Sequence, residues 1–326
     1  MAAYKGKRIV FAAVGKVEIL DFEQEKPKKG EVTIQNICSL ISAGTELSRL
    51  YDYHMVKKPY PCNTGYLSCG KVVDIGEGVT GIKMGGIYLA GSMGHLGYLN
   101  VPAADLIAVP EGLKPEDAVF TNIGGISIRA VRQANIHLGD SVFIVGLGLI
   151  GQFAQIFSRL DGGVPVVGVD LSPKRRKIAE QTGLKYALDP KAADFEDALK
   201  KITGDGLFRA CLDSTGTPFA ISSLPARTAK FGSIIVLGGV HEKVSTDFYT
   251  YIQKRNLRII GAGEPDPANF PYDGKENPKV ILNLMKENIL DVTPLRTHFV
   301  GLEKAAEMYR MLHEEKDAGM GVVFKW

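Results

Sequence analysis

The chain has 326 residues, of which 45% are hydrophobic and 23% are charged, and its formal net charge is +3 at pH 7. This length exceeds what one compact core accommodates and suits two domains. The small net charge, with basic residues spread along the chain, argues against a nucleic-acid partner. No run approaches the roughly 20 apolar residues that a membrane-spanning helix needs, so we expect no membrane insertion.

The N-terminal sequence MAAYKGKRIVF contains no apolar segment of signal-peptide length. The four cysteines are scattered along the chain and do not suggest a disulfide framework. We therefore expect a cytoplasmic protein.

The first third of the chain is predicted to be rich in β-strands. Short runs with β-branched residues lie at 7–11, 32–37, 70–75 and 86–90. From about residue 141 to 263, strand-like runs such as SVFIVG and VPVVGVD alternate with helix-like runs such as LIGQFAQIFSRL and SPKRRKIAEQTG. This alternation predicts a parallel sheet with helices on both faces. Helical patterns follow at 278–288 and 302–315, and GVVFKW predicts a final strand.

The sharpest motif is IVGLGLIGQF, where Gly146, Gly148 and Gly151 form G-x-G-x-x-G between an apolar strand and a helix. In a dinucleotide-binding turn, the first glycine permits the tight turn and the second lets the backbone approach a pyrophosphate. The third lets the helix pack closely on the strand. The start of the helix, with Leu149 and Ile150, would present amide groups to the phosphates. The alternative is a purely structural turn, but the flanking strand and helix favour dinucleotide binding.

An acidic residue follows at the end of the next strand, because Asp170 lies 19 residues after Gly151. In dinucleotide-binding domains such a residue binds the adenosine ribose hydroxyls, and its carboxylate would repel the 2′-phosphate of NADP. The neighbouring Lys174, Arg175 and Arg176 indicate the opposite preference, because an arginine beside the ribose can accept that phosphate. Alternatively, these bases begin a solvated helix face. We predict NAD as the cofactor, with Arg175 close to its ribose.

Several segments together resemble the medium-chain dehydrogenase/reductase superfamily. They are SLISAGTELSRL (39–50), GYLSCGKVVDIGEGVTGIKMGG (65–86), GYLNVPAADLIAVPEGL (97–113), the glycine turn and DSTG (213–216). The resemblance implies an α/β fold with a GroES-like β-rich catalytic domain at 1–122 and 271–326. It also implies a Rossmann domain with a doubly wound parallel sheet at 123–270, and a substrate cleft between the domains. Further cofactor contacts are expected at the ends of later strands, from Ser214, Thr215, Gly216 and Gly238.

The chain departs from the zinc alcohol dehydrogenases of this superfamily at the positions that bind zinc. Ala43 stands where they have a ligand cysteine, and Tyr66 and Leu67 stand where they have a His-Glu pair. Asn122 lies near the third ligand position. Alanine and leucine cannot bind zinc, and a neutral phenol is a poor substitute for imidazole. Residues 87–96 contain no cysteine for a structural zinc lobe. We therefore expect no metal.

Without zinc, hydride transfer needs a general acid or base and hydrogen-bond donors near the substrate oxygen. The resemblance implies five candidates: Thr45 at the proton-relay position, Glu46 beside it, Tyr66 at the former histidine position, His95 in the loop MGHLGY, and Asn122. Each has a structural alternative. Thr45 could cap a helix that begins at Glu46, and Glu46 could be a first-turn carboxylate favoured by the helix dipole. Tyr66 could serve packing, and His95 could lie in a surface loop.

The leading hypothesis is a metal-independent, NAD(H)-dependent oxidoreductase that interconverts a secondary alcohol and its ketone. SLISAGTE resembles zinc-less members of the superfamily from sugar, cyclitol and natural-product pathways, which implies a polyhydroxylated small-molecule substrate. One alternative is an NADPH-dependent quinone or enone reductase, which Asp170 disfavours. Another is a non-catalytic NAD-binding subunit. The resemblance also implies a homodimer, joined through the sheet edge that GSIIVLGG and LRIIGAG would supply.

Overall fold

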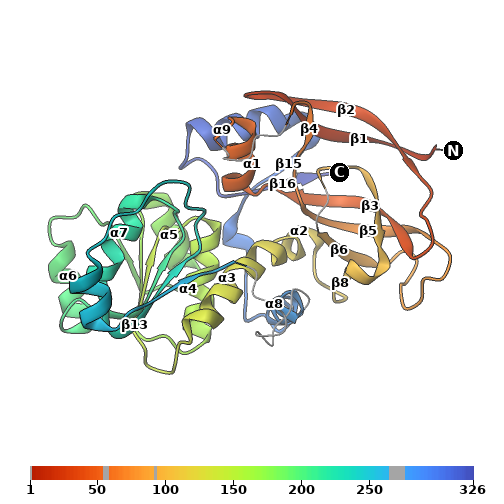
Figure 1. The fold of residues 1–326 in the computed structure, drawn as a ribbon. Coiled ribbons are helices and arrows are strands. Elements are labelled where there is room, and N and C mark those ends of the chain that lie inside the picture. The colour runs from red at the N-terminus through yellow and green to blue at the C-terminus, as the bar shows by residue number, and fades with distance from the viewer. Residues whose placement is uncertain (1, 54–58, 92–93, 264–275) are drawn as a thin grey trace. The chain divides into compact units, whose positions relative to one another are not determined.

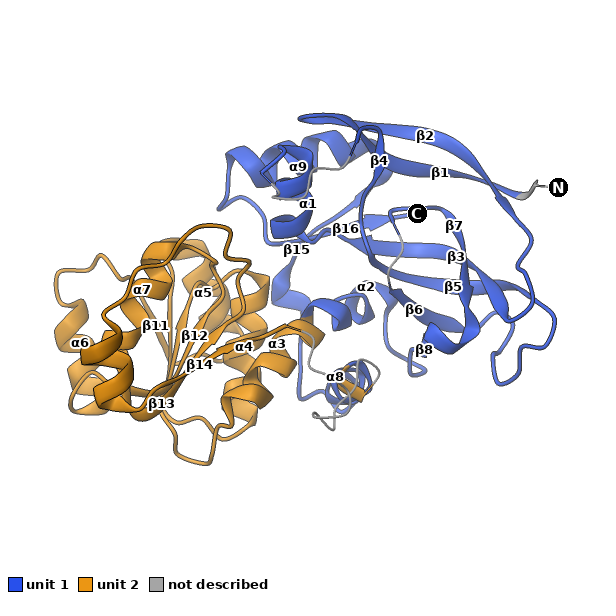
Figure 2. Ribbon diagram, in the orientation of Figure 1, with its two compact units in different colours: residues 1–123, 278–326 blue, residues 124–277 orange. Residues whose placement is uncertain are grey.

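The computed structural model describes residues 2–53, 59–91, 94–263 and 276–326, and the chain divides into two compact units. Unit 1 comprises Met1–Ile123 and Pro278–Trp326, and unit 2 comprises Gly124–Asn277 (Figure 2). These divisions lie one and seven residues beyond the predicted boundaries at 122 and 270. Both fall within helices, α3 (Thr121–Ala134) and α8 (Glu276–Lys286), whose continuous helical pattern conceals a boundary in the sequence.

Unit 1 is built mainly of strands, as the first third of the sequence predicts (Figure 1). Among its described residues, a seven-stranded sheet runs in the order β15-β16-β3-β5-β6-β8, with β7 paired to β3, and a three-stranded sheet runs β2-β1-β4. The larger sheet is mixed, because β15 and β16 pair in parallel whereas β3 pairs antiparallel with β5, β7 and β16. The strands are β1 (Ala2–Ala13), β2 (Lys16–Glu25), β3 (Glu31–Leu40), β4 (Cys62–Asn63), β5 (Leu67–Ile75), β6 (Ile87–Gly91), β7 (Tyr98–Pro102), β8 (Ile107–Ala108), β15 (Arg296–Gly301) and β16 (Gly321–Lys325).

Helices of unit 1 pack against these sheets and close its core. They are α1 (Ala43–Leu50), α2 (Pro115–Ala118) and α9 (Ala305–Glu314), with short 3-10 turns at Ala103–Asp105, Thr293–Leu295 and Leu302–Lys304. Most of α8 also belongs to unit 1. Phe11 of β1, Leu50 of α1, Tyr309 of α9 and Phe324 of β16 meet in one buried cluster. This cluster joins the start of the chain to its last strand. It also packs against α1, the helix that contains the candidate site residues Thr45 and Glu46.

Unit 2 contains a six-stranded parallel sheet in the order β11-β10-β9-β12-β13-β14. The predicted strand–helix alternation is confirmed, and the strand order is that of a Rossmann domain. Order reverses between β9 and β12, which places their carboxyl ends side by side. The elements are β9 (Val142–Val145), α4 (Leu149–Leu160), β10 (Val166–Val169), α5 (Pro173–Gln181), β11 (Tyr186–Leu188), α6 (Phe195–Thr203), β12 (Phe208–Asp213), α7 (Pro218–Arg227), β13 (Thr228–Val236), a π-helical turn (Phe248–Gln253) and β14 (Arg258–Gly261).

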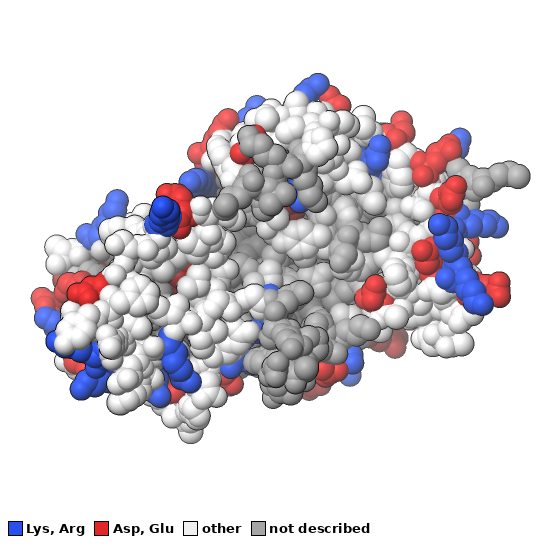
Figure 3. Space-filling view, viewed as in Figure 1, with Lys and Arg blue, Asp and Glu red and all other residues white. Residues whose placement is uncertain are grey.

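Charged side chains of both signs are interspersed on the face shown in Figure 3, as the small formal charge leads one to expect. Within the described ranges, none of the helices combines the length and the apolar character required to cross a bilayer.

Candidate active site

The glycine turn of unit 2 connects β9 to α4. Gly146 has φ +90°, a left-handed backbone conformation that favours glycine. Gly148 is the N-cap of α4. A Cβ on Gly151 would lie only 1.8 Å from the carbonyl oxygen of Gly146, so no side chain fits there. The turn therefore has the tight backbone and close helix–strand approach expected of a pyrophosphate-binding site, with Leu149 and Ile150 in the first turn of α4.

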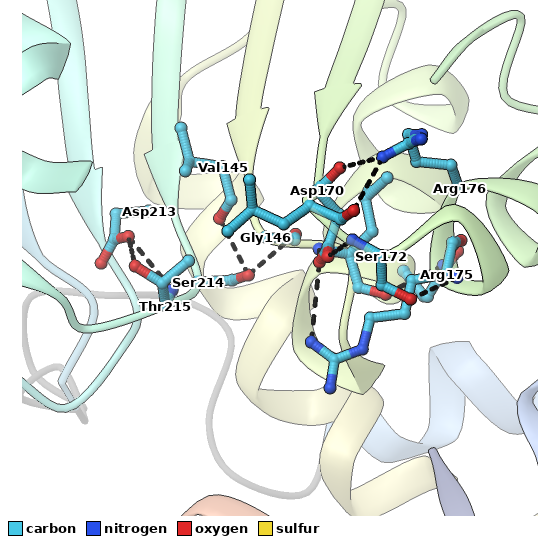
Figure 4. Close-up of polar contacts among 12 residues, drawn as sticks. Val145, Gly146, Asp170, Ser172, Arg175, Arg176, Asp213, Ser214 and Thr215 are labelled. Atoms are coloured by element: carbon cyan, nitrogen blue, oxygen red, sulfur yellow. Dashed lines mark hydrogen bonds and ion pairs between the residues drawn. The ribbon is translucent and has the colours of Figure 1, made fainter. Parts of the chain in front are cut away.

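Asp170, which follows β10, is tied to this turn. One carboxylate oxygen accepts the backbone N–H of Leu147 at 2.7 Å, and the other accepts that of Ser172 at 2.8 Å. A carboxylate offers about four lone-pair sites, so these two bonds leave capacity for ribose hydroxyls. Figure 4 shows the Arg175 guanidinium on one side of Asp170, with Nη1 3.6 Å from the carboxylate, and Arg176 on the other, donating to the backbone carbonyl of Asp170.

The end of β12 forms the other side of the strand-order reversal. The Ser214 hydroxyl donates to the carbonyl oxygens of Val145 and Gly146 at 3.1 and 2.9 Å, which joins this end to the glycine turn (Figure 4). Asp213, wholly buried, accepts from the amide and hydroxyl of Thr215 at 3.1 and 2.6 Å, and from the amide of Gly216 at 2.9 Å. The sequence prediction missed Asp213, although its place as the first residue of DSTG signals such a side-chain-capped turn.

Gly216 and Gly238 lie against each other at the ends of β12 and β13. A Cβ on Gly238 would stand 2.0 Å from the amide nitrogen of Gly216, which itself has φ +68°. A side chain at either position would therefore collide with neighbouring backbone atoms. The predicted cofactor residues of unit 2 therefore gather at the carboxyl ends of β9, β10, β12 and β13, and these groups fit a dinucleotide.

In unit 1, a buried carboxylate organises the polar candidates. Glu46 accepts the amide of Ser42 at 2.7 Å with Oε1. Its Oε2 accepts the hydroxyls of Thr64 at 2.7 Å and Tyr309 at 2.5 Å, and lies 3.1 Å from His95 Nε2. Burial by itself would raise the pKa of Glu46. The attraction and hydrogen bond of His95, with the hydrogen bonds of Tyr309 and Thr64, outweigh it and lower that pKa, so the carboxylate is ionised.

His95 is enclosed within unit 1. Its side chain has no solvent-accessible surface, and its Nδ1 lies 2.8 Å from the Ser39 hydroxyl, which accepts the indole N–H of Trp326 at 2.8 Å. The surface-loop alternative for His95 is therefore wrong. Glu46 is only 3% exposed. Because neither side chain offers a titratable atom to solvent, this burial argues against direct proton exchange between either residue and a substrate.

Tyr66 has a different environment. It is half-buried, and its hydroxyl donates to the Oγ of Ser42. Ser42 is the N-cap of α1, yet its hydroxyl makes no capping bond to the helix. The carboxylate of Glu46 binds the Ser42 amide instead. The sequence prediction did not include Ser42, and no local pattern distinguishes it from the neighbouring Thr45.

Thr45 and Asn122 occupy first turns of helices. Because α1 begins at Ala43, Thr45 lies inside the helix, and the suggestion that it caps a helix beginning at Glu46 is wrong. The Thr45 side chain is exposed, and Asn122, in α3, is half-buried. Both remain candidates for contacts with substrate.

The resemblance places the zinc ligands of related enzymes at Ala43, Tyr66, Leu67 and near Asn122, and neither alanine nor leucine can bind zinc. Ala43 is the first residue of α1, and Leu67 is buried at the start of β5. Through the described stretches, no three His, Cys, Asp or Glu side chains gather in a way that could hold a metal ion. Cys69 is buried and Cys62 is half-buried. His54, a further polar residue suited to the recognition of hydroxyl groups, lies outside the described residues.

Comparisons with known proteins bear on both units. Residues 150–274 match the family model described as zinc-binding dehydrogenase. L-galactonate-5-dehydrogenase of Escherichia coli is 27% identical over 285 residues, covering 77% of this chain and 79% of its own. L-threonine 3-dehydrogenase of Pyrococcus abyssi is 25% identical and covers 92% of each chain. The crystal structure of 2R,3R-butanediol dehydrogenase from Bacillus subtilis superposes with a TM-score of 0.86 at 21% identity, covering 98% of this chain and 99% of its own.

The structural likeness extends over nearly the whole chain and confirms the predicted α/β fold, with its mixed sheet and its six-stranded parallel sheet. The family model matches residues 150–274, and the curated relatives are dehydrogenases, so the chain is similar in sequence to zinc-binding dehydrogenases of the medium-chain dehydrogenase/reductase type.

Proposed function

We propose that this protein is a metal-independent, NAD(H)-dependent oxidoreductase that interconverts a secondary alcohol, of the sugar, cyclitol or other polyol class, and its ketone. The observation that carries the proposal is the link between Asp170 and the glycine turn, in which the Asp170 carboxylate accepts the amide of Leu147. This link fixes an acidic group beside a backbone turn that accommodates a pyrophosphate, the combination that binds NAD.

The residues that would hold the cofactor all belong to unit 2. The amides at the start of α4 and the turn of Gly146 and Gly148 would bind the pyrophosphate, and Asp170 would bind the ribose. Ser214, Thr215, Gly216 and Gly238 would line the nicotinamide side. The nicotinamide ring, when bound, supplies the acceptor or donor of hydride. The contribution of the remaining residues is to orient the ligand and to move a proton.

We assign the proton transfer to Tyr66. In ketone reduction, its Oη–H bond breaks as the proton passes to the oxygen of the developing alcohol, and the Tyr66 phenolate then regains a proton from solvent. The Ser42 hydroxyl, which accepts from Tyr66 in the resting state, can rotate and donate to the phenolate. Alcohol oxidation uses the same atoms in reverse. Ala43 and Leu67 support a route without zinc, since neither can act as a ligand.

The substrate class is supported by the relatives, whose names specify hydroxylated compounds such as L-galactonate, L-threonine and 2R,3R-butanediol. The exposed hydroxyl of Thr45 and the amide of Asn122 would suit recognition of substrate hydroxyl groups. We further propose that the protein is a cytoplasmic homodimer.

The test uses chelator-treated protein and the absorbance of reduced nicotinamide. One series supplies NAD with sugars, polyols, cyclitols and simple secondary alcohols, and a second supplies NADPH with quinones and enones. Formation of NADH with a polyol would support the proposal, and unchanged turnover after added zinc would support metal independence. Consumption of NADPH with enones alone would contradict the proposal and indicate a C=C reductase. Tight NADH binding without turnover of any substrate would indicate a non-catalytic subunit.

A further inference from the structure

We propose that Glu46 is a positioning residue for Tyr66, because its buried carboxylate binds Ser42, the hydrogen-bond partner of Tyr66, and Thr64, two residues before Tyr66. The inference rests on the proposed role of Tyr66 as the proton donor, and it extends that role to a residue that does not touch the substrate.

The carboxylate acts on the two partners through different oxygens. Oε1 of Glu46 accepts the amide of Ser42 and so fixes the backbone of this residue. The Ser42 hydroxyl accepts the hydrogen bond from Tyr66. Oε2 accepts the hydroxyl of Thr64, two residues before Tyr66, and so fixes the chain segment that bears the phenol. One side chain thus bridges α1 and the segment that enters β5. Loss of the bridge would leave the Tyr66–Ser42 pair without a common support.

His95 also contacts the segment that contains Thr64 and Tyr66. Its amide donates to the carbonyl of Thr64 at 2.5 Å, and its Nε2 faces Glu46. The imidazole ring occupies the space beside Gly65, where a Cβ would come within 2.6 Å of the ring carbons. Gly65 also has φ +82°, so the turn before Tyr66 is fixed by its own backbone and by the ring packed against it.

The hydrogen-bond directions extend this support to Trp326. An indole N–H can only donate, so Ser39 accepts from Trp326 and can donate its own proton to His95 Nδ1. His95 then donates from Nε2 to Glu46. Every group in this series therefore has a hydrogen-bond partner. Trp326 is the single tryptophan in the sequence, so its fluorescence reports on the integrity of the series.

A wholly buried carboxylate is costly to place in a protein core, and an apolar side chain of similar volume would often serve stability as well. Holding the reacting groups of a site in position is a role that apolar packing does not supply. A misplacement of about 1 Å can reduce turnover about 100-fold. We therefore expect the effect of disturbing Glu46 to appear in kcat.

The experiment compares Thr64→Val with Thr33→Val in the full chain. Both threonines are buried in unit 1 and donate to a side-chain oxygen, Thr64 to Glu46 at 2.7 Å and Thr33 to Asn100 at 2.8 Å. We expect Thr64→Val to lower kcat about 10- to 100-fold. KM and NADH affinity should stay near the wild-type values, and the alkaline limb of the kcat–pH profile should shift. Thr33→Val should leave the profile and kcat unchanged.

Glu46→Gln and Tyr66→Phe complete the design. Glu46→Gln should lower kcat at least as far as Thr64→Val and alter Trp326 emission. If Glu46→Gln does not fold, the kcat of Thr64→Val tests the positioning role. Equal kcat and equal pH profiles for Thr64→Val and Thr33→Val would overturn the positioning role. Full activity of Tyr66→Phe would instead overturn the assignment of Tyr66 within the proposed function. A nearly inactive Tyr66→Phe together with an unchanged Thr64→Val would remove the positioning inference alone.

Discussion

Tyr309 and Glu46 lie 263 residues apart in the sequence, and the Tyr309 hydroxyl donates a hydrogen bond to the Glu46 carboxylate in the core of unit 1. Burial, followed by the charge of Glu46 and the hydrogen bond to it, raises the pKa of Tyr309 well above its usual value. The phenol therefore keeps its proton and remains a donor. This bond links α9, late in the chain, to α1, so it should contribute to the stability of the whole unit.

Tyr309→Phe removes this donor with little change of shape. Hydrogen bonds to charged groups contribute about 1.5–3 kcal/mol, so we expect the free energy of unfolding to fall by about that amount. The matched control is Tyr60→Phe, because the Tyr60 hydroxyl donates to the neutral carbonyl of Arg49 at 2.7 Å, a bond worth about 0.5–1.5 kcal/mol. Denaturant unfolding of both variants measures the difference. Equal losses would mean that the charge of Glu46 adds nothing.

The stability of unit 1 should also depend on acid through Glu46. Its pKa in the folded protein is lower than the ordinary value of 4.5, so Glu46 contributes stability above pH 4.5 that is lost as the pH falls through the lowered folded value. The unfolding free energies of wild type and Glu46→Gln should differ above this window and converge below it. Measurements of unfolding across acid pH test this.

Glu196 provides the control for that titration. Its pKa is also lowered, mainly by the hydrogen bond from Arg227, but its side chain is 57% exposed and solvent screens the pair. We expect Glu196→Gln to change the pH dependence of unfolding far less than Glu46→Gln. A constant gap between wild type and Glu46→Gln at all acid pH values would show that folding does not lower the pKa of Glu46.

The glycine turn allows a test that separates folding from cofactor binding. A Cβ on Gly151 would collide with the Gly146 carbonyl, whereas a Cβ on Gly148 would meet no atom within 4 Å in the protein itself. We expect Gly151→Ala to lower the unfolding midpoint and abolish NADH binding. Gly148→Ala should retain the midpoint but weaken binding, because the methyl group would obstruct the pyrophosphate. An NADH affinity of Gly148→Ala equal to that of the wild type would contradict the proposed location of the phosphates.

The parts that could be predicted from the sequence have local signals. The G-x-G-x-x-G spacing reflects a contact between Gly146 and Gly151, five residues apart, and the strand–helix alternation reflects successive layers of one sheet. Most of the residues predicted to bind the cofactor stand shortly after a predicted strand, so the sequence places them at one end of the parallel sheet. In unit 1, the strand segments were also visible as β-branched runs, although their pairing order was not.

The buried network could not be predicted, because Glu46 joins residues 18, 49 and 263 positions away. His95 stands between glycines in a loop-like segment, a pattern typical of the surface. Its burial depends on Gly65, whose missing side chain leaves room for the ring. The place of Thr45 was uncertain for a related reason, since Ser42 and Thr45 are both suited to begin a helix and only the folded backbone distinguishes them.

The proposed homodimer predicts a role for the edge of the parallel sheet. Among the strands of the described ranges, only β13 pairs with β14, and the Ile259 side chain is 48% exposed. The Ala262 amide donates to Val236 of β13, so by strand alternation the Ile260 amide also faces β13 and the Ile259 amide faces away. Ile259→Pro should therefore yield a folded monomer, whereas Ile260→Pro should lose a sheet bond and stability. Light scattering after size exclusion decides, and a dimeric Ile259→Pro would exclude this edge.

The final prediction concerns the choice between NAD and NADP. Asp170 and Arg175 act in opposite directions on a 2′-phosphate, since the carboxylate repels it and the guanidinium attracts it. Because Arg175 Nη1 lies only 3.6 Å from the Asp170 carboxylate, both charges would act on a phosphate at the ribose. Removing the charge in Asp170→Asn keeps the size of the side chain and an oxygen that can accept the Leu147 amide. We expect the ratio of NADPH to NADH affinity to rise about 10-fold, equivalent to about 1.4 kcal/mol.

The double variant Asp170→Asn/Arg175→Gln identifies the source of any gain. If Arg175 binds the phosphate once Asp170 is neutral, the double variant should lose most of the gain in NADPH affinity while NADH affinity changes little. NADH and NADPH titrations at low and high salt provide the measurement, because an arginine–phosphate contact weakens as salt screens it. An affinity ratio that stays at the wild-type value in Asp170→Asn would mean that Asp170 supports the glycine turn through Leu147 and Ser172 and does not select the cofactor.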